Sequence, residues 1–151
     1  MSITLPWRRP KKRPADLPPY ERGLLYEEAA ARWLKKEYGF TLLEKNYVFR
    51  QYEIDLILKQ GDLICFTEVK SRLQGTRFDP LSAVDGVKRR GIRQAAVAYL
   101  QALRRDGIDT DPLLFRCDVV TAEFDEDGVP RRFVLYADYM EIDDEDFRSA
   151  L

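Results

Sequence analysis

The stretch Tyr52-Glu-Ile-Asp-Leu-Ile-Leu-Lys-Gln-Gly-Asp-Leu-Ile-Cys-Phe-Thr-Glu-Val-Lys70 decides the fold of this chain. Its two apolar runs flank the turn signal Lys59-Gln-Gly-Asp62, which predicts a β-hairpin with a tight turn. Apolar side chains occur at both parities of these runs, so both faces of the hairpin are expected to be at least partly buried. A sheet covered on both faces needs helices on both sides, which favours an α/β domain.

The segments around the hairpin support this architecture. Residues 23–38 have the apolar spacing of an amphipathic helix, and Gly39 is expected to end it. Residues 42–59 and Leu63 to Lys70 have strand character. A long helix is predicted from about 86 to 105, and further strands at Leu113 to Thr121 and Arg132 to Tyr136. We therefore expect a central sheet with helices on both faces.

Charged residues interrupt the apolar hairpin at four positions, which are Glu53, Asp55, Glu68 and Lys70. A turn centred on Gly61-Asp62 would place Asp55 directly opposite Glu68, whereas a turn centred on Gln60-Gly61 would pair Glu53 with Glu68. A three-residue turn would send the two acidic groups to opposite faces. The residues of the turn therefore decide whether these carboxylates meet.

Neighbouring buried carboxylates are costly without a compensating charge. One explanation is a salt-bridge patch at the open end of the sheet, in which Lys70 neutralises Glu68. The other is a divalent-cation site in which Asp55 and Glu68 provide oxygen ligands, the Val69 carbonyl adds another, and Lys70 orients or deprotonates a water molecule. Mg²⁺ matches this small ligand set, and Mn²⁺ is expected to substitute for it.

The composition narrows the possible chemistry. The 151 residues include no histidine, which excludes Ser-His-Asp systems and His-ligated metal sites. The two cysteines, Cys65 and Cys117, lie in apolar runs and are expected to be buried reduced thiols. No apolar run approaches the roughly 18 residues of a membrane span, and no secretory signal is recognisable. A cytoplasmic protein without a membrane partner is therefore expected.

The overall charge of −1 conceals an uneven distribution. Residues 1–22 contain six bases and two acids, net +4, and are rich in proline, so we expect an extended or disordered basic arm. Residues 138–151 contain one base and six acids, net −5, and are expected to form an acidic tail. Residues 23–137 form the predicted domain between them.

At the charged positions the chain resembles a known family. Tyr52-Glu-Ile-Asp-Leu-Ile57, Phe66-Thr-Glu-Val-Lys-Ser-Arg72 and Glu27 resemble the YraN family of predicted endonuclease-like proteins. That family is similar to archaeal Holliday-junction resolvases and to PD-(D/E)XK nucleases. The resemblance implies a restriction-endonuclease-like fold with a mixed central sheet flanked by helices on both faces. It runs from about Gly23 to Tyr136.

The resemblance also implies roles for individual residues. Asp55 and Glu68 match the metal ligands of the family, Lys70 matches its catalytic lysine, and Glu27 matches the helical acid of resolvase-like members. Tyr26 and Tyr52 stand where the family usually has glycine, so they either narrow the cleft or stack on a splayed base. A two-fold homodimer is a further possibility carried over from resolvase-like relatives.

Basic residues follow the second strand of the hairpin and open the long helix. As candidates for neutralising nucleic-acid phosphates we identify Arg72, Arg77, Lys88, Arg89, Arg90 and Arg93. Asp118 is expected to pair with Arg116 rather than to bind metal. The resulting hypothesis is a Mg²⁺-dependent, endonuclease-like protein that hydrolyses phosphodiester bonds in structured or branched DNA. The alternatives are an inactive nucleic-acid-binding module of the same fold and a protein-interaction domain.

Overall fold

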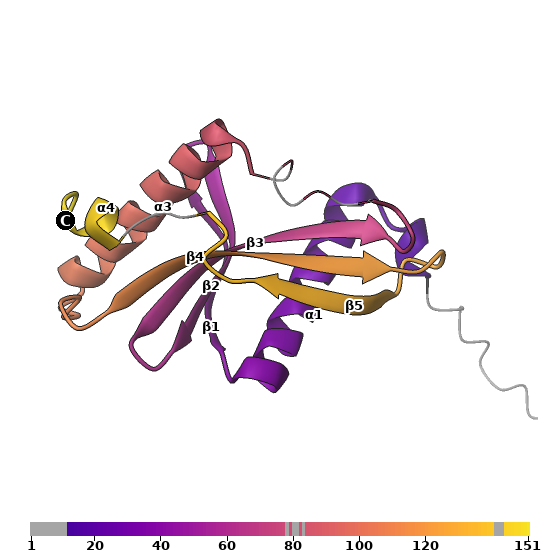
Figure 1. Ribbon diagram of the computed structural model, residues 1–151, viewed down its shortest axis with the longest axis horizontal. Helices are drawn as coiled ribbons and strands as arrows, with labels where there is room; N and C mark the ends of the chain where they lie inside the picture. Colours follow the sequence, from indigo (N-terminus) through magenta and orange to yellow (C-terminus); the bar gives the residue numbers. More distant parts are fainter. Residues whose placement is uncertain (1–11, 78, 80–81, 83, 141–143) are drawn as a thin grey trace, which may run out of the picture.

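A five-stranded mixed sheet forms the centre of the protein, with strand order β1-β2-β3-β4-β5 (Figure 1). The computed structural model describes residues 12–77, 79, 82, 84–140 and 144–151. The elements are η1 (Pro14–Asp16), α1 (Pro19–Tyr38), β1 (Thr41–Phe49), β2 (Tyr52–Gln60), β3 (Leu63–Leu73), α3 (Gly86–Arg105), β4 (Leu114–Phe124), β5 (Pro130–Tyr136) and α4 (Asp144–Arg148). Only β3 and β4 pair in parallel among these strands, and the connection between them contains α3.

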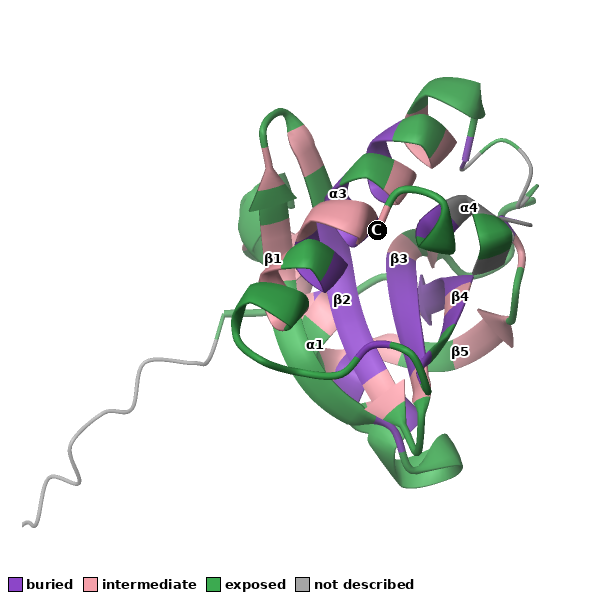
Figure 2. Ribbon diagram, turned by 90° about the vertical axis from the view of Figure 1, so that its left-hand side faces the viewer, coloured by how far each residue is buried: buried purple, intermediate pink, exposed green. Residues whose placement is uncertain are grey.

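Two hydrophobic clusters lie on opposite faces of the sheet. On one face, Ala30 and Leu34 of α1 cluster with residues of β2 and β3, including Leu58. On the other face, α3 and α4 cover a larger cluster that includes Phe66 and Phe147 (Figures 1 and 2). The expected α/β fold with helices on both faces is thus confirmed, and it is consistent with a restriction-endonuclease-like fold.

The turn of the central hairpin has the length that brings the carboxylates together. β2 ends at Gln60 and β3 begins at Leu63, so Gly61 and Asp62 form a two-residue turn. Gly61 has a positive φ of 57°, which glycine adopts without steric cost. The register runs from Gln60↔Leu63 to Leu56↔Thr67, where the regular pairing ends, one residue short of Asp55 and Glu68. Of the two turns that the sequence left open, the structure therefore has the one at Gly61-Asp62, but the direct pairing of Asp55 with Glu68 expected from it is not part of the ladder.

The prediction of a single strand over residues 42–59 was wrong. The chain reverses at Arg50 and Gln51, which separates β1 from β2, and the two strands pair antiparallel. No glycine or proline marks this turn in the sequence. Arg50 instead adopts the left-handed conformation with a φ of 56°, which pattern reasoning does not expect of an arginine.

The ends of the chain are more structured than the sequence predicted. Helix α1 begins at Pro19 rather than at residue 23, since proline is well tolerated in the first turn of a helix. Pro14–Asp16 forms a 3-10 helix, and the Ala15 N–H donates to the Asp127 carbonyl at 3.0 Å. Residues 1–11 of the expected arm lie outside the described residues. These contacts extend the folded domain to at least residue 14.

The segment expected to be a solvated acidic tail contributes to the core. Met140 and Phe147 are both buried, and the Phe147 ring lies 5.8 Å from Phe66 and 5.5 Å from Phe115, measured between centroids. The prediction relied on the six acids of this segment and did not take account of Met140 and Phe147, the two side chains that anchor it in the core. The domain boundary expected at residue 137 therefore does not separate a tail from the fold.

The two cysteines are free and buried, as expected. Cys65 belongs to the cluster beneath α1, whereas Cys117 belongs to the cluster beneath α3, so the sheet itself lies between them. Burial raises the pKa of Cys65 to about 12, which keeps this thiol protonated at neutral pH. In the described part of the chain, no helix is long and apolar enough to cross a membrane.

A close contact between Tyr52 and Gly91 joins the start of β2 to α3. A Cβ atom built at Gly91 would lie 2.4 Å from Cδ1 of Tyr52, so the ring occupies the space that a larger residue would need. Glycine inside a helix costs about 1 kcal/mol relative to alanine, and here that cost allows the ring to pack. Tyr52, which stands where the family usually has glycine, therefore packs its ring against Gly91 of α3.

Gly91→Ala is expected to lower the free energy of unfolding by about 1–3 kcal/mol, because overpacking outweighs the gain in helix propensity. In a Tyr52→Ala background the same substitution should stabilise the protein. Urea unfolding of the two single variants and the double variant measures this coupling. An equal effect of Gly91→Ala in both backgrounds would contradict it.

Candidate functional site

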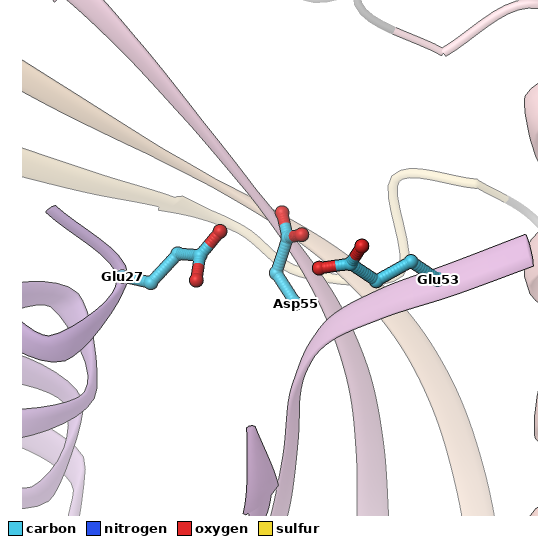
Figure 3. Close-up of side chains that lie close together, drawn as sticks. All are labelled: Glu27, Glu53 and Asp55. Carbon is cyan, nitrogen blue, oxygen red and sulfur yellow. The ribbon is translucent and has the colours of Figure 1, made fainter. Parts of the chain in front are cut away.

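Three carboxylate side chains meet where α1 passes the beginning of β2. Glu27 comes from α1, and Glu53 and Asp55 come from β2 (Figure 3). One carboxylate oxygen from each lies within 4.8 Å of the other two. Since like charges at this distance repel, the cluster needs a proton or a cation to compensate it.

A change in the facing of β2 positions Asp55. Ile54 packs in the cluster beneath α3, whereas Leu56 packs in the cluster beneath α1, although alternation along a regular strand would give both the same face. The regular pairing with β3 also ends at Leu56↔Thr67. Beyond it, the Val69 N–H donates to Oδ2 of Asp55 at 2.8 Å, so a side chain replaces the strand partner.

Asp55 is a strongly perturbed acid. Its exposed fraction is 9%, and burial raises its pKa from 3.8 to about 8. The charge of Glu68 adds to this rise, while the Val69 N–H opposes it. Burial also raises the pKa of Glu27, with further contributions from the charges of Glu53 and Glu68. The carboxylates of α1, β2 and β3 therefore form one electrostatic unit.

Glu68 lies between two lysines. Lys70 Nζ is 3.4 Å and Lys88 Nζ is 3.2 Å from Oε1 of Glu68, a side chain that is only 4% exposed. Both contacts use the same oxygen. Oε2 is buried and has no hydrogen-bond partner among the residues that the structure describes. The salt bridge expected between Lys70 and Glu68 exists, but it leaves half of this carboxylate unsatisfied.

Asn46 is a part of the cluster that sequence reasoning missed. Its Nδ2 donates to Oε2 of Glu27 at 2.7 Å and to Oε1 of Glu53 at 2.8 Å, so one amide group bridges two acids. Its backbone has a φ of 49°, a conformation that asparagine adopts more readily than most residues. Asn46 lies within a stretch of strand character, and nothing local in the sequence marks it, because its partners Glu27 and Glu53 are 19 and 7 residues away.

Asn46→Gly is expected to weaken Mn²⁺ binding roughly tenfold, a typical effect of removing a group that orients a metal ligand. Glycine tolerates the positive φ, so the stability of the metal-free protein should change little. Asn46→Ala should show the same loss of affinity together with lower stability. Thermal shifts over a Mn²⁺ titration provide both values, and unchanged affinity in the glycine variant would contradict an orienting role.

The raised pKa of Asp55 predicts how the stability of the metal-free protein depends on pH. The folded state binds the Asp55 proton more tightly than the unfolded state, so this group stabilises the fold fully below about pH 4. That contribution is lost as the pH rises toward about 8. Relative to Asp55→Asn, the melting temperature of the unmodified protein in chelator should therefore fall by several degrees between pH 5 and pH 9. A constant difference across that range would contradict the raised pKa.

A hollow of about 430 Å³ adjoins Lys88 and one acid of the cluster, Glu53. It lies between the beginning of β2 and the first turns of α3, and its lining includes Tyr52, Glu53 and Val87. Asp85, which also lines it, accepts a hydrogen bond from the Lys88 N–H at 2.8 Å and caps the helix. The site therefore has open space beside the acids, on the side where the basic end of α3 begins.

The six basic candidates for nucleic-acid contact occupy different places. Lys88 points to Glu68 and belongs to the cluster itself. Arg72 binds Glu123 of β4, so its guanidinium is part of an internal ion pair. Arg77 is exposed after β3. Arg90 and Arg93 line a second hollow, next to the turn between β1 and β2. The Arg89 side chain is half-buried, and its Nε has no hydrogen-bond partner in the described ranges.

Tyr26 does not enter the cleft. Its ring is buried and stacks on Phe124 with a centroid distance of 5.2 Å, and its hydroxyl donates to the Gly128 carbonyl at 2.7 Å. The expectation that Tyr26 narrows the cleft or stacks on a base was wrong, since its side chain packs against the connection between β4 and β5. The orientation of this side chain depends on tertiary packing and has no signal in the sequence.

The predicted pairing of Asp118 with Arg116 is confirmed. Arg116 Nε and Nη2 donate to the two oxygens of Asp118 at 2.8 and 2.9 Å, and the Asp138 N–H donates to the same carboxylate at 2.8 Å. This acid is thus satisfied by a bidentate ion pair and a backbone donor. It has no comparable need for a cation.

The cluster fits a hard divalent cation. Its donors are carboxylate oxygens, which suit Mg²⁺ or Mn²⁺. Oε2 of Glu68 has no partner among the described residues, and the pKa values of Asp55 and Glu27 are raised, so a bound cation would stabilise the ionised form of these acids. Asp55 is common to both candidate ligand sets, one with Glu27 and Glu53 and the other with Glu68.

Comparison with known proteins places these residues within a shared segment. The profile of "Uncharacterised protein family UPF0102" matches residues 26–122, which include all the acids and lysines of the cluster. A UPF0102 protein of Chlorobium chlorochromatii is 49% identical over 80 residues, covering 53% of this chain and 61% of that relative. One of Anaeromyxobacter sp. (strain Fw109-5) is 35% identical over 107 residues, covering 71% and 76%. One of Syntrophus aciditrophicus is 39% identical over 106 residues, covering 70% and 79%.

Proposed function

The chain belongs to the uncharacterised protein family UPF0102, the YraN family, which has a PD-(D/E)XK nuclease-like fold, and we propose that it is a divalent-metal-dependent endonuclease. Its substrate in this proposal is structured or branched DNA. Family membership alone carries the fold, whereas the chemistry rests on the site. The observation that carries the proposed metal dependence is the buried Oε2 of Glu68, which has no hydrogen-bond partner among the described residues. The neighbouring Asp55 has a pKa raised to about 8, mainly by burial.

The roles follow from the positions of the side chains. Asp55 and Glu68 would hold Mg²⁺ or Mn²⁺, with Glu27 completing the negative cluster. A bound divalent cation would supply Lewis-acid stabilisation of a phosphodiester and lower the pKa of a water molecule. Lys70 Nζ lies beside Glu68, where its ammonium would orient that water and its neutral amine would accept the water's proton. Lys88, which belongs to α3, contacts the same carboxylate oxygen of Glu68.

Nucleic acid would approach the hollow between β2 and α3. Arg77 is exposed after β3 and Arg90 lines the neighbouring hollow, and both would neutralise phosphates of a bound strand, which makes binding sensitive to salt. Tyr52 lines that hollow and packs on Gly91 of α3. It leaves about 430 Å³ of space next to Glu53 and Lys88, which favours an accessible site over a blocked one.

The direct test combines metal binding with cleavage. The full chain, freed of metal by chelator, is titrated with Mg²⁺, Mn²⁺ and Ca²⁺ while its melting temperature is recorded. It is then incubated with single-stranded, duplex, forked and four-way DNA, and with matching RNA, in Mg²⁺ or Mn²⁺. We expect a metal-dependent rise in melting temperature and cleavage of the branched DNA.

Other outcomes assign the protein to a different class. Salt-sensitive DNA binding with neither a metal-induced rise in melting temperature nor cleavage would identify an inactive nucleic-acid-binding module. The absence of metal binding, nucleic-acid binding and cleavage together would favour a protein-interaction domain. Either result would overturn the proposed function.

A further inference from the structure

A second hollow, of about 370 Å³, lies on the far side of the turn between β1 and β2. It lies between that turn and the middle of α3, and its lining includes Phe49, Arg50, Arg90, Arg93 and Val97. None of these residues lines the hollow beside the carboxylates. The turn that separates β1 from β2 thus divides two neighbouring sites of different chemistry.

The lining of this hollow is cationic. It contains three guanidinium groups and the amide side chains of Gln94 and Gln101, and no carboxylate side chain belongs to it among the described residues. The carboxylate cluster has the opposite charge and lies just across the turn. Guanidinium groups bind phosphate through directed, charge-assisted hydrogen bonds, so an anionic ligand fits here.

The hollow also offers a flat surface. Arg50 Cζ lies 5.1 Å from the centroid of the Phe49 ring, so a guanidinium stacks on an aromatic side chain. Val97 and Ala98 of α3 add an apolar floor. A guanidinium plane supported by an aromatic ring is a surface on which a nucleobase stacks. The combination of phosphate binding and base stacking indicates a nucleotide rather than an inorganic anion.

The spacing connects the two sites. Arg50 lines the cationic hollow, and the next two residues of the chain, Gln51 and Tyr52, line the hollow beside the acids, so the two hollows adjoin across this turn. A strand whose phosphate lies at the carboxylates can therefore extend a neighbouring nucleotide past the turn. A base that is paired in a duplex must break its pair before it can reach Arg50, which costs free energy, whereas an unpaired base reaches Arg50 without that cost.

We propose that the hollow of Phe49, Arg50, Arg90 and Arg93 binds an unpaired nucleotide next to the phosphodiester held at the carboxylates. Its base stacks on Arg50, and its phosphate lies against the guanidinium groups of α3. This inference rests on the proposed function and deepens it, because it makes DNA with unpaired nucleotides at a branch the preferred substrate.

The test measures binding separately from cleavage. Fluorescein-labelled forked DNA and a fully paired duplex of the same length are titrated with the full chain in chelator, which removes any contribution from metal. The variants are Arg50→Gly, which keeps the positive φ but removes the guanidinium, and Arg90→Ala on the exposed side of α3. Arg32→Ala is the matched control, because Arg32 is an exposed arginine of α1 paired with Glu28.

The unmodified chain and Arg32→Ala are expected to bind the fork at least tenfold more tightly than the duplex. Arg50→Gly and Arg90→Ala should each lose roughly tenfold in affinity for the fork and less than threefold for the duplex. Equal losses on both DNAs, or none, would overturn the nucleotide site. Cleavage by the unmodified chain would still uphold the proposed function in that case, whereas selective fork binding without cleavage would uphold the nucleotide site alone.

Discussion

Replacing Asp55 by asparagine is expected to reduce metal-dependent DNA cleavage by roughly 10³-fold or more, since the site then lacks a carboxylate common to both candidate ligand sets. Asparagine has nearly the same shape, and its side-chain oxygen can still accept the Val69 N–H now bound at 2.8 Å. The fold should therefore remain intact. Cleavage rates of forked DNA at saturating Mn²⁺ measure the effect.

The same variant separates a metal ligand from a structural acid. If Asp55 holds the cation, Asp55→Asn should lose most of the Mn²⁺-induced rise in melting temperature, while the metal-free variant melts above the unmodified protein at pH 8. Asp118→Asn is the matched control, because Asp118 is a buried acid held by Arg116. It should lower stability and leave the metal-induced rise in place. Undiminished cleavage by Asp55→Asn would rule out the role assigned to this residue.

Lys70→Ala is expected to reduce cleavage by about 10²- to 10³-fold, whereas Lys88→Ala should reduce it by about tenfold. Both ammonium groups contact the same oxygen of Glu68, at 3.4 and 3.2 Å, so their difference depends on what else each one does. Lys70 extends from β3, two residues beyond Glu68, whereas Lys88 lies in the first turn of α3. We assign the proton-transfer role to Lys70 and the positioning of Glu68 to Lys88.

A conservative substitution distinguishes these two roles. Lys70→Arg retains a positive charge but cannot accept a proton near neutral pH, so it should remain as inactive as Lys70→Ala. Lys88→Arg should restore most of the activity lost in Lys88→Ala, because only charge and reach are required there. The rates of all four variants across pH 6–9 provide the comparison. A larger loss in Lys88→Ala than in Lys70→Ala would reverse the assignment.

The two helical faces and the central hairpin could be predicted from the sequence because their signals are local. Apolar periodicity indicated α1 and α3, and Gly39 was correctly expected to end α1 in a left-handed conformation with a φ of 76°. Glycine and aspartate marked a turn near residues 60–62 but left two positions for it open, and the structure has Gly61 at the first central position with a φ of 57°. The turn set the register only as far as Leu56↔Thr67, and the change of facing in β2 decided where Asp55 lies.

Features that depend on contacts between residues distant in sequence could not be predicted from local patterns. The reversal at Arg50 has no glycine or proline, and the burial of Phe147 depends on Phe66 and Phe115, which are far from it in sequence. Composition therefore described residues 138–151 as an acidic tail, although two of its side chains lie in the core. The prediction from composition followed the many acidic residues of this segment, whereas its burial depends on two apolar side chains and their tertiary contacts.

The sequence by itself determined the chemistry available to this protein. Because the chain has no histidine, any metal site must use carboxylates. The acids of one hairpin, with a lysine two residues beyond Glu68, offered such a site, since side-chain alternation along a strand is a local property that the sequence reveals. Only the tertiary structure decided which groups share the site. Asn46 joins it by bridging Glu27 and Glu53, and Lys88 joins it by contacting Glu68, because β1 and α3 pack beside the hairpin, and no local pattern encodes contacts between separate elements.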